Sequence, residues 1–198
     1  MHSNTSQSPS YGYPSSLARF AVAPSQLSTA ARPIVVVGAC IFAPRGEPSS
    51  SLSSPPRMLL LRRAATDSFP NVWEVPGGGA EPADATVLDA VAREVLEESA
   101  LVVTDVVELL GTQEFTSSSG AGCTKYNFLV ETAPGPVATH PAEHSEWKWF
   151  RAEEIEALLV ANEEVRNLLA AAFARVRELR GGATEPDVAC AGGASDLR

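Results

Sequence analysis

A glycine-rich turn between a short strand and an amphipathic helix restricts the fold of this chain more than any other feature. The turn is Pro76-Gly77-Gly78-Gly79, and it follows the strand-like end Trp73-Glu74-Val75. Glycines allow backbone amides and carbonyls to approach a ligand closely, because no Cβ atom blocks them. From Thr86 to Ser99 the apolar residues recur with helical spacing, and Thr86 is a suitable N-cap. The sequence therefore predicts a strand, a tight turn and a helix in succession.

The helix carries three carboxylates, Glu94, Glu97 and Glu98, spaced i, i+3 and i+4. This spacing brings the side chains together on one face of the helix, where like charges repel unless a cation lies among them. Hard divalent cations prefer oxygen ligands, and Mg²⁺ usually takes one or two carboxylates together with substrate phosphates. A solvated helix face is the alternative, and it is the more common one for an isolated Glu-Val-Leu-Glu-Glu. The preceding glycine turn favours the metal site.

The segment resembles the Nudix box, G-x5-E-x7-R-E-U-x-E-E-x-G-U, in which U is a bulky aliphatic residue. Arg93-Glu94-Val95-Leu96-Glu97-Glu98 matches R-E-U-x-E-E at every position, and Gly78 followed by Asp84 matches G-x5-E with Asp in place of Glu. The sequence departs from the box in an eight-residue gap before Arg93 and in Ala100 at the last Gly. The longer gap falls in a loop, and Ala100 is expected to adopt the left-handed conformation that ends a helix.

This resemblance implies an α/β fold, a Nudix-type α/β/α sandwich with a mixed central sheet. It also implies a hydrolase that cleaves a nucleoside diphosphate linked to another moiety with Mg²⁺ or Mn²⁺. Glu94 and Glu98 would be the main metal ligands, helped by the Gly77 carbonyl. Glu97 would be a ligand or the catalytic base, and Arg93 would orient the carboxylates through an i,i+4 contact with Glu97. General chemistry agrees, because metal ions acidify an attacking water while a carboxylate removes its proton.

Residues outside the box complete the expected site. Many family members take a further acid from a loop, and Glu143, in Pro141-Ala142-Glu143-His144, is our candidate for a catalytic residue, with a solvated loop acid as an equal alternative. A lone histidine such as His144 is more often structural than catalytic. Arg62 and Arg63 end an apolar strand before the turn and are candidates for binding substrate phosphates. Strand alternation directs at most one of these two arginines toward the substrate.

The pattern of the other segments fits this fold class. Ile34–Phe42 is apolar and β-branched, and with Met58–Leu61 it predicts two antiparallel strands joined by a Pro/Ser-rich loop. After the helix, further strands are predicted over 102–110, 111–116, 125–131 and 147–150, followed by helices over 152–159 and 163–180. Gly181-Gly182 is a stop signal for the last helix.

Three parts are expected along the chain. Residues 1–32 are rich in Ser and Pro and contain no acid, which predicts a flexible N-terminal arm, with a mitochondrial transit peptide as the alternative. Residues 33–182 are expected to form the hydrolase domain. Residues 183–198 lack periodicity and are expected to be a disordered C-terminal tail.

Composition limits the classes of partner. The chain has 198 residues and a net charge of −9, which argues against nonspecific binding to nucleic acid or an anionic membrane. We expect a small phosphorylated, nucleotide-type substrate, no nucleic-acid or membrane partner and a cytoplasmic location, with a homodimer left open. Three cysteines without a CxxC pair and only three histidines argue against a zinc site or a disulfide framework.

Other functions compete with this prediction. The runner-up is a non-catalytic nucleotide-sensing module of the same fold. The loss of a glutamate from the R-E-U-x-E-E part of the box would have favoured it, and Glu94, Glu97 and Glu98 are all present. An isomerase acting on an isoprenoid diphosphate would need a cysteine in a motif, and neither Cys40 nor Cys123 lies in one. The net charge disfavours an RNA-cap hydrolase. The loops that would select a substrate, 44–57 and 117–124, contain no diagnostic residues.

Overall fold

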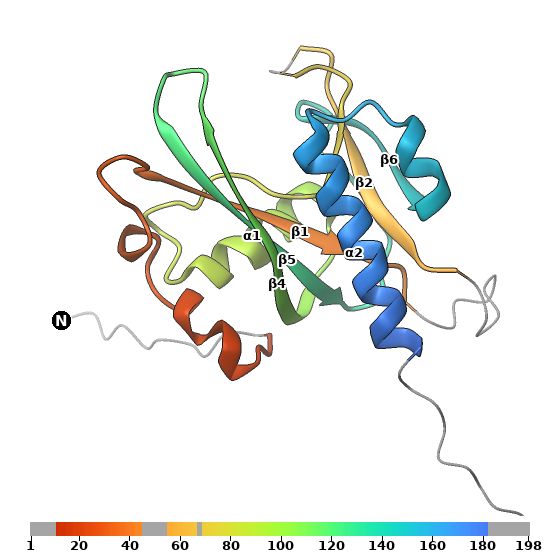
Figure 1. Ribbon diagram of the computed structural model, residues 1–198, viewed down its shortest axis with the longest axis horizontal. Helices are drawn as coiled ribbons and strands as arrows, with labels where there is room; N and C mark the ends of the chain where they lie inside the picture. The colour runs from red at the N-terminus through yellow and green to blue at the C-terminus, as the bar shows by residue number, and fades with distance from the viewer. Residues whose placement is uncertain (1–10, 45–54, 67–68, 182–198) are drawn as a thin grey trace, which may run out of the picture.

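The computed structural model describes residues 11–44, 55–66 and 69–181 (Figure 1). Its strands are β1 (Ile34–Ile41), β2 (Arg57–Arg63), β3 (Trp73–Glu74), β4 (Val103–Thr116), β5 (Gly122–Thr132) and β6 (His144–Arg151). Its α-helices are α1 (Val87–Ser99) and α2 (Glu163–Gly181), and its 3-10 helices are η1 (Ser15–Phe20), η2 (Pro24–Gln26) and η3 (Ala152–Ala157). Among these described residues, no helix is both long and apolar enough to cross a membrane.

The strands form two three-stranded sheets. The first has the order β1-β5-β4, in which β1 and β5 are parallel and β5 and β4 are antiparallel. The second has the order β3-β2-β6 and is antiparallel. The first sheet is therefore mixed, as predicted.

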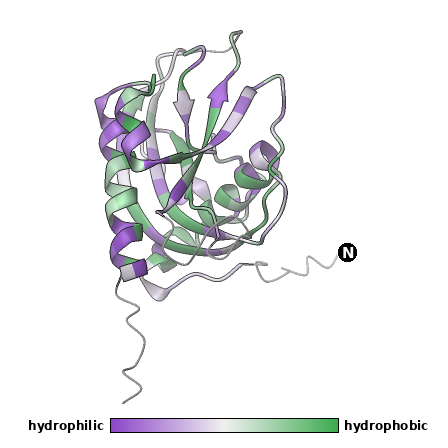
Figure 2. Cartoon of the chain, turned by 90° about the vertical axis from the view of Figure 1, so that its right-hand side faces the viewer, coloured by the Kyte–Doolittle hydropathy of each residue, from purple (hydrophilic) through white to green (hydrophobic). Residues whose placement is uncertain are grey.

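A helix covers each face of the strands. α1 shares one hydrophobic cluster with Val35 and Val37 of β1, whereas α2 shares the other with Cys40 of β1 and Leu129 of β5. Successive residues of a strand point to opposite faces, so α1 and α2 lie on opposite sides of the sheet. Figure 2 shows green, apolar segments of the strands in the interior of the molecule, whereas strand segments near the top of the view are hydrophilic and α2 mixes both kinds of residue. The predicted α/β/α sandwich is confirmed.

Both ends of α1 have the predicted local structure. The Thr86 side chain accepts a hydrogen bond from the backbone amide of Asp89, so it caps the helix N-terminus. Ala100 follows the last turn with φ 59°, in the left-handed region, and its amide donates to the Leu96 carbonyl. This reversal directs the chain from α1 into β4.

The predicted antiparallel pairing of Ile34–Phe42 with Met58–Leu61 is wrong over most of its length. β1 pairs with β5, and β2 pairs with β3 and β6; in the described residues only an isolated bridge, Phe42 with Met58, joins the two segments. Neighbouring segments often pair, but here the glycine turn lies along the remaining edge of β1.

Two other element predictions need correction. β4 is one strand where two were predicted, because Gly111 lies at a shift in the register with β5 and not at a strand end. The helix predicted over 152–159 is the 3-10 helix η3.

Residues 11–32 differ from the flexible arm that the composition predicts. Leu17 and Phe20 are buried, and the Phe20 ring contacts the rings of Tyr126 and Phe128 edge-on. The Tyr11 hydroxyl donates to Asp89 of α1 at 2.7 Å. A few large apolar residues thus attach a polar segment to the core, which average composition does not reveal. Residues 1–10 and the predicted tail 183–198 lie outside the described residues.

Candidate active site

The glycine turn lies along the edge of β1 that β5 does not occupy. The Val37 amide donates to the Gly78 carbonyl at 2.9 Å, and the Ala39 amide donates to the Pro76 carbonyl at 2.8 Å. A Cβ atom on Gly77 would collide with the Val37 carbonyl oxygen, and it would lie 2.8 Å from the Gly38 Cα. This close approach requires glycine at residue 77, and it holds the turn rigidly against the sheet.

Two of the three helix carboxylates face this turn. Glu94 is 8% exposed and Glu98 7% exposed. The Gly77 amide donates to Glu98 Oε2 at 2.7 Å, and a Cβ on Gly78 would lie 2.8 Å from Glu94 Oε1. The Glu97 side chain is 57% exposed and lies apart from this face. The predicted common face therefore holds for Glu94 and Glu98 alone, because the turn covers only one side of α1.

Arg93 connects the turn to the helix. Its guanidinium donates to both carboxylate oxygens of Asp84 and to the Gly79 carbonyl at 2.9 Å. One nitrogen, Nη1, lies 2.8 Å from Glu94 Oε1 and 2.9 Å from Glu97 Oε2. The structure thus contains the expected i,i+4 contact between Arg93 and Glu97. These partners also raise the pKa of Arg93, its hydrogen bond with Asp84 most of all, so it stays charged.

The electrostatics of the buried pair favour an added cation. Burial raises the pKa of Glu98 to about 7, against the lowering effect of the Gly77 amide. Burial also raises the pKa of Glu94, although Arg93 opposes this. Glu94 and Glu98 are buried one helical turn apart, and Arg93 divides its single positive charge between Glu94 and Glu97. The negative charge of the buried pair is therefore not fully compensated. A divalent cation would compensate it, and the oxygen donors of Glu94 and Glu98 fit Mg²⁺ or Mn²⁺.

Glu143 and His144 lie beside Glu98 in space. His144 begins β6 and is 2% exposed, whereas Glu143 precedes it on the surface. One ligand atom from each of these three residues lies within 4.8 Å of the others. The fold therefore brings the predicted loop acid close to Glu98 of α1.

Sequence reasoning missed His144 and Glu74 as members of the site. His144 Nε2 lies 3.2 Å from Glu74 Oε1, and His144 Nδ1 lies 3.9 Å from Glu98 Oε1. Burial lowers the pKa of His144, but the hydrogen bond to Glu74 and the charge of Glu98 raise it more, so the net pKa is raised. The signal available in the sequence was a carboxylate, Glu74, two residues before Pro76 of the glycine turn.

The two arginines proposed for substrate binding have separate partners. Arg63 Nη1 donates to Glu74 Oε1 at 2.7 Å, so Arg63 contacts the carboxylate that holds His144. Arg62 Nη1 lies 3.3 Å from Glu146 Oε2 on an exposed stretch of β2 and β6. A role in phosphate binding stays a prediction for both.

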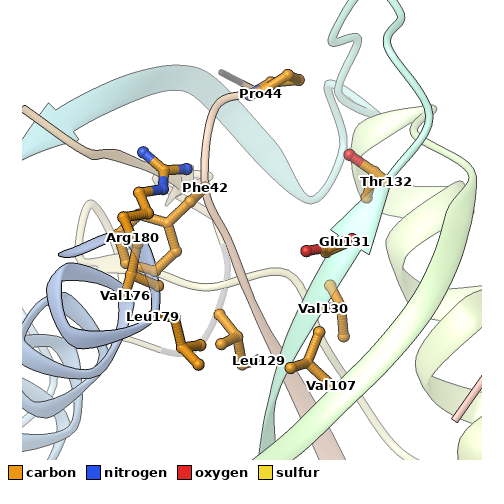
Figure 3. Close-up of a pocket in the computed structure, with 10 residues that line it drawn as sticks. All are labelled: Phe42, Pro44, Val107, Leu129, Val130, Glu131, Thr132, Val176, Leu179 and Arg180. Atoms are coloured by element: carbon orange, nitrogen blue, oxygen red, sulfur yellow. The ribbon is translucent and has the colours of Figure 1, made fainter. Parts of the chain in front are cut away.

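A pocket of about 390 Å³ lies elsewhere in the molecule (Figure 3). Its lining comes from α2, from β4 and β5 and from the chain after β1, and includes Phe42, Leu129 and Arg180. None of the carboxylates described above lines it. We therefore assign no part of the candidate site to this pocket.

A family model and several solved structures are similar to this chain. A family model described as the NUDIX domain matches residues 32–172, more than half of the chain. The MutT protein from Methanosarcina mazei Go1 has a similar structure, with a TM-score of 0.55 and 23% identity over 86% of this chain and 99% of that chain. An Ap4A hydrolase from C. elegans, solved as a binary complex, gives a TM-score of 0.55 and 21% identity over 72% of this chain and 97% of that chain. At these identities the likeness shows the fold.

A stretch of the sequence also matches a curated relative. The m7GpppN-mRNA hydrolase NUDT17 from Danio rerio is 54% identical over 46 residues, which are 23% of this chain and 15% of that protein. The match thus spans a small part of the relative's length.

Proposed function

Because the chain belongs to the NUDIX domain family, whose model matches residues 32–172, we propose that it is a metal-dependent hydrolase. Its substrate is a nucleoside diphosphate linked to another moiety, and the bond broken is a phosphoanhydride. The observation that carries this proposal is the buried pair Glu94 and Glu98, one helical turn apart beneath a glycine turn. A solvated helix face, the main alternative from the sequence, does not account for two buried carboxylates.

Glu94 and Glu98 would hold a divalent ion, with the Gly77 carbonyl as a further oxygen donor. When bound, such an ion neutralises diphosphate oxygens and lowers the pKa of a coordinated water. The residues around this position hold the metal-binding carboxylates in place. Arg93 holds Glu94, and the Gly77 amide holds Glu98, so both carboxylates are oriented before the substrate arrives.

Glu97 and Glu143 are the two candidates for proton acceptor. Glu97 is exposed, and its contact with Arg93 orients the carboxylate. Glu143 is also exposed and lies beside Glu98. In either case a carboxylate takes one proton from the attacking water as the water oxygen bonds to phosphorus. The bridging P–O bond then breaks, and the leaving phosphate oxygen keeps the electron pair.

The test is hydrolysis by Glu98→Gln and its matched control Glu81→Gln. Gln keeps the volume of Glu98 and removes its charge, so we expect activity to fall by about 10²–10⁴-fold. Glu81 is exposed on the turn, and its Gln variant should keep most of the activity. Circular dichroism checks both folds, and phosphate release is measured with Mg²⁺, with Mn²⁺ and with chelator.

The substrate panel contains dinucleotides including Ap4A, nucleotide sugars, oxidised nucleoside triphosphates and capped RNA. Capped RNA is included because of the 46-residue match to the m7GpppN-mRNA hydrolase, and the net charge of −9 weighs against it. Full activity of Glu98→Gln, or activity indifferent to chelator, would contradict the metal mechanism. Nucleotide binding without hydrolysis of any panel member would instead support the runner-up, a nucleotide-sensing module.

A further inference from the structure

His144 has one ring nitrogen paired and the other unpaired. Nε2 lies 3.2 Å from Glu74 Oε1. Nδ1 is buried and has no hydrogen-bond partner among the described residues. Its nearest oppositely charged group is Glu98 Oε1 at 3.9 Å, beyond hydrogen-bond distance. A buried ring nitrogen without a partner is costly, so its position needs an explanation.

Glu74 determines which nitrogen carries the proton. Arg63 donates to the same Glu74 oxygen that faces His144, at 2.7 Å, and this contact keeps the carboxylate charged and in place. A charged carboxylate can only accept hydrogen bonds, so it selects the tautomer with hydrogen on Nε2. Nδ1 of that tautomer has a free lone pair, and the lone pair is on the side of Glu98.

This arrangement is typical of metal-ligating histidines. Such a histidine commonly donates its second N–H to a carboxylate, which fixes the tautomer and strengthens the ligand nitrogen. Glu98 and Glu143 supply oxygen atoms that, with the histidine nitrogen, all lie within 4.8 Å of one another. Adjacent ligands at about 2.1 Å from an ion are about 3.0 Å apart and opposite ligands about 4.2 Å apart, so side-chain shifts of about an ångström would let all three groups bind one ion.

We propose that His144 Nδ1, Glu98 and Glu143 bind a transition-metal ion and make this part of the site prefer Mn²⁺ over Mg²⁺. The proposal rests on the proposed function in one respect, the assignment of Glu98 as a metal ligand. With Glu143 bound to the ion, Glu97 is the remaining candidate for proton acceptor. An imidazole nitrogen is a softer donor than oxygen and suits transition metals, whereas Mg²⁺ takes oxygen ligands almost entirely. In the alternative, Nδ1 carries a hydrogen and donates a hydrogen bond to Glu98. His144 would then position the Glu98 carboxylate and would not bind metal itself.

The direct test is pulsed electron paramagnetic resonance on the Mn²⁺-loaded protein, which detects nitrogen bound to the ion. The double variant His2→Asn/His140→Asn leaves His144 as the only histidine. We expect ¹⁴N modulation of the Mn²⁺ echo in this variant, and its replacement by ¹⁵N coupling when the protein contains ¹⁵N-labelled histidine. This comparison leaves His144 itself unchanged, so it does not depend on how a mutant folds.

Binding measurements give a second readout. His144→Asn should weaken Mn²⁺ binding by about tenfold or more, as expected for a lost ligand, and should weaken Mg²⁺ binding less. His140→Asn is the control, because His140 is exposed on the same loop. Absence of ¹⁴N modulation from Mn²⁺-loaded protein, or equal losses for the two metals, would overturn the proposal. Hydrolysis that continues with Mg²⁺ in that case would leave the proposed function standing.

Discussion

Arg93 donates to both carboxylate oxygens of Asp84, from Nε to Oδ1 at 3.0 Å and from Nη2 to Oδ2 at 3.1 Å. A planar guanidinium and a carboxylate match in this geometry, which is stronger and more directional than a single contact. Asp84 also accepts from the Glu81 amide at 2.7 Å. The aspartate that stands at the glutamate position of the box thus joins α1 to the glycine turn.

The first prediction concerns this pair. Asp84→Asn replaces a buried, charged carboxylate with a neutral amide. One of the two Arg93 N–H groups that donate to Asp84 then has no acceptor there. We expect the free energy of unfolding to fall by about 2 kcal/mol. Hydrolysis should fall as well, because Arg93 also holds Glu94. Urea denaturation and phosphate release measure the two effects.

The matched control removes a charge from an exposed ion pair. Glu178 pairs with Arg175 on α2, and the two side chains are 68% and 40% exposed. Glu178→Gln should leave the free energy of unfolding nearly unchanged, because solvent screens an exposed ion pair. Equal effects of the two substitutions would show that the Asp84 contact contributes no more than a surface pair.

The second prediction concerns the end of α1. Ala100 has φ 59°, a conformation that glycine adopts without the Cβ penalty. Ala100→Gly should therefore leave stability unchanged or raise it by up to about 1 kcal/mol. Ala170→Gly, at an exposed position inside α2, is the control and should cost about 1 kcal/mol. A clear loss of stability in Ala100→Gly would mean that the helix does not end at this residue.

The third prediction concerns the N-terminal segment. Phe20 is 2% exposed, and it packs edge-on against Phe128 with ring centroids 5.1 Å apart. Phe20→Ala should lower the free energy of unfolding by about 3 kcal/mol through lost burial and the resulting cavity. Tyr13→Ala, at a side chain that is 40% exposed, should have a much smaller effect. Thermal unfolding of both variants measures the difference. An unchanged melting temperature in Phe20→Ala would instead support the flexible N-terminal arm that the composition predicts.

The fourth prediction concerns pH. Burial raises the pKa of Glu98 from 4.5 to about 7. The folded protein therefore keeps a proton on Glu98 at pH values where the unfolded chain has lost it. As a result, the free energy of unfolding of the metal-free protein should fall as pH rises from about 4.5 to about 7. The raised pKa of His144 acts in the same direction at the upper end of this range.

Urea denaturation with chelator across this pH range tests the direction. Glu98→Gln removes the titrating group and should flatten the decline. Saturating Mn²⁺ should stabilise the protein more at pH 8 than at pH 5, because proton and metal compete for the same carboxylate. Stability that rises across the range in the metal-free protein and is unaffected by Glu98→Gln would contradict the pKa shift.

Local sequence determined the part of the site that lies close together along the chain. The glycine turn, the Thr86 cap, the left-handed Ala100 and the Arg93–Glu97 contact all depend on residues within a few positions of one another. Helix geometry and glycine sterics apply to such segments wherever they occur in a fold. The mixed sheet and the sandwich of helices were likewise predicted from the box and the order of elements.

Tertiary structure alone decided the features that join distant segments. The turn covers one side of α1, and so Glu94 and Glu98 are buried while Glu97 is not. β1 pairs with β5, which is distant in the sequence. No local sequence signal predicts that β5 is its partner. The Glu74–His144–Glu98 arrangement combines β3, β6 and α1. Of these three residues only Glu98 lies in the box, and long-range packing alone buries their side chains and brings them together.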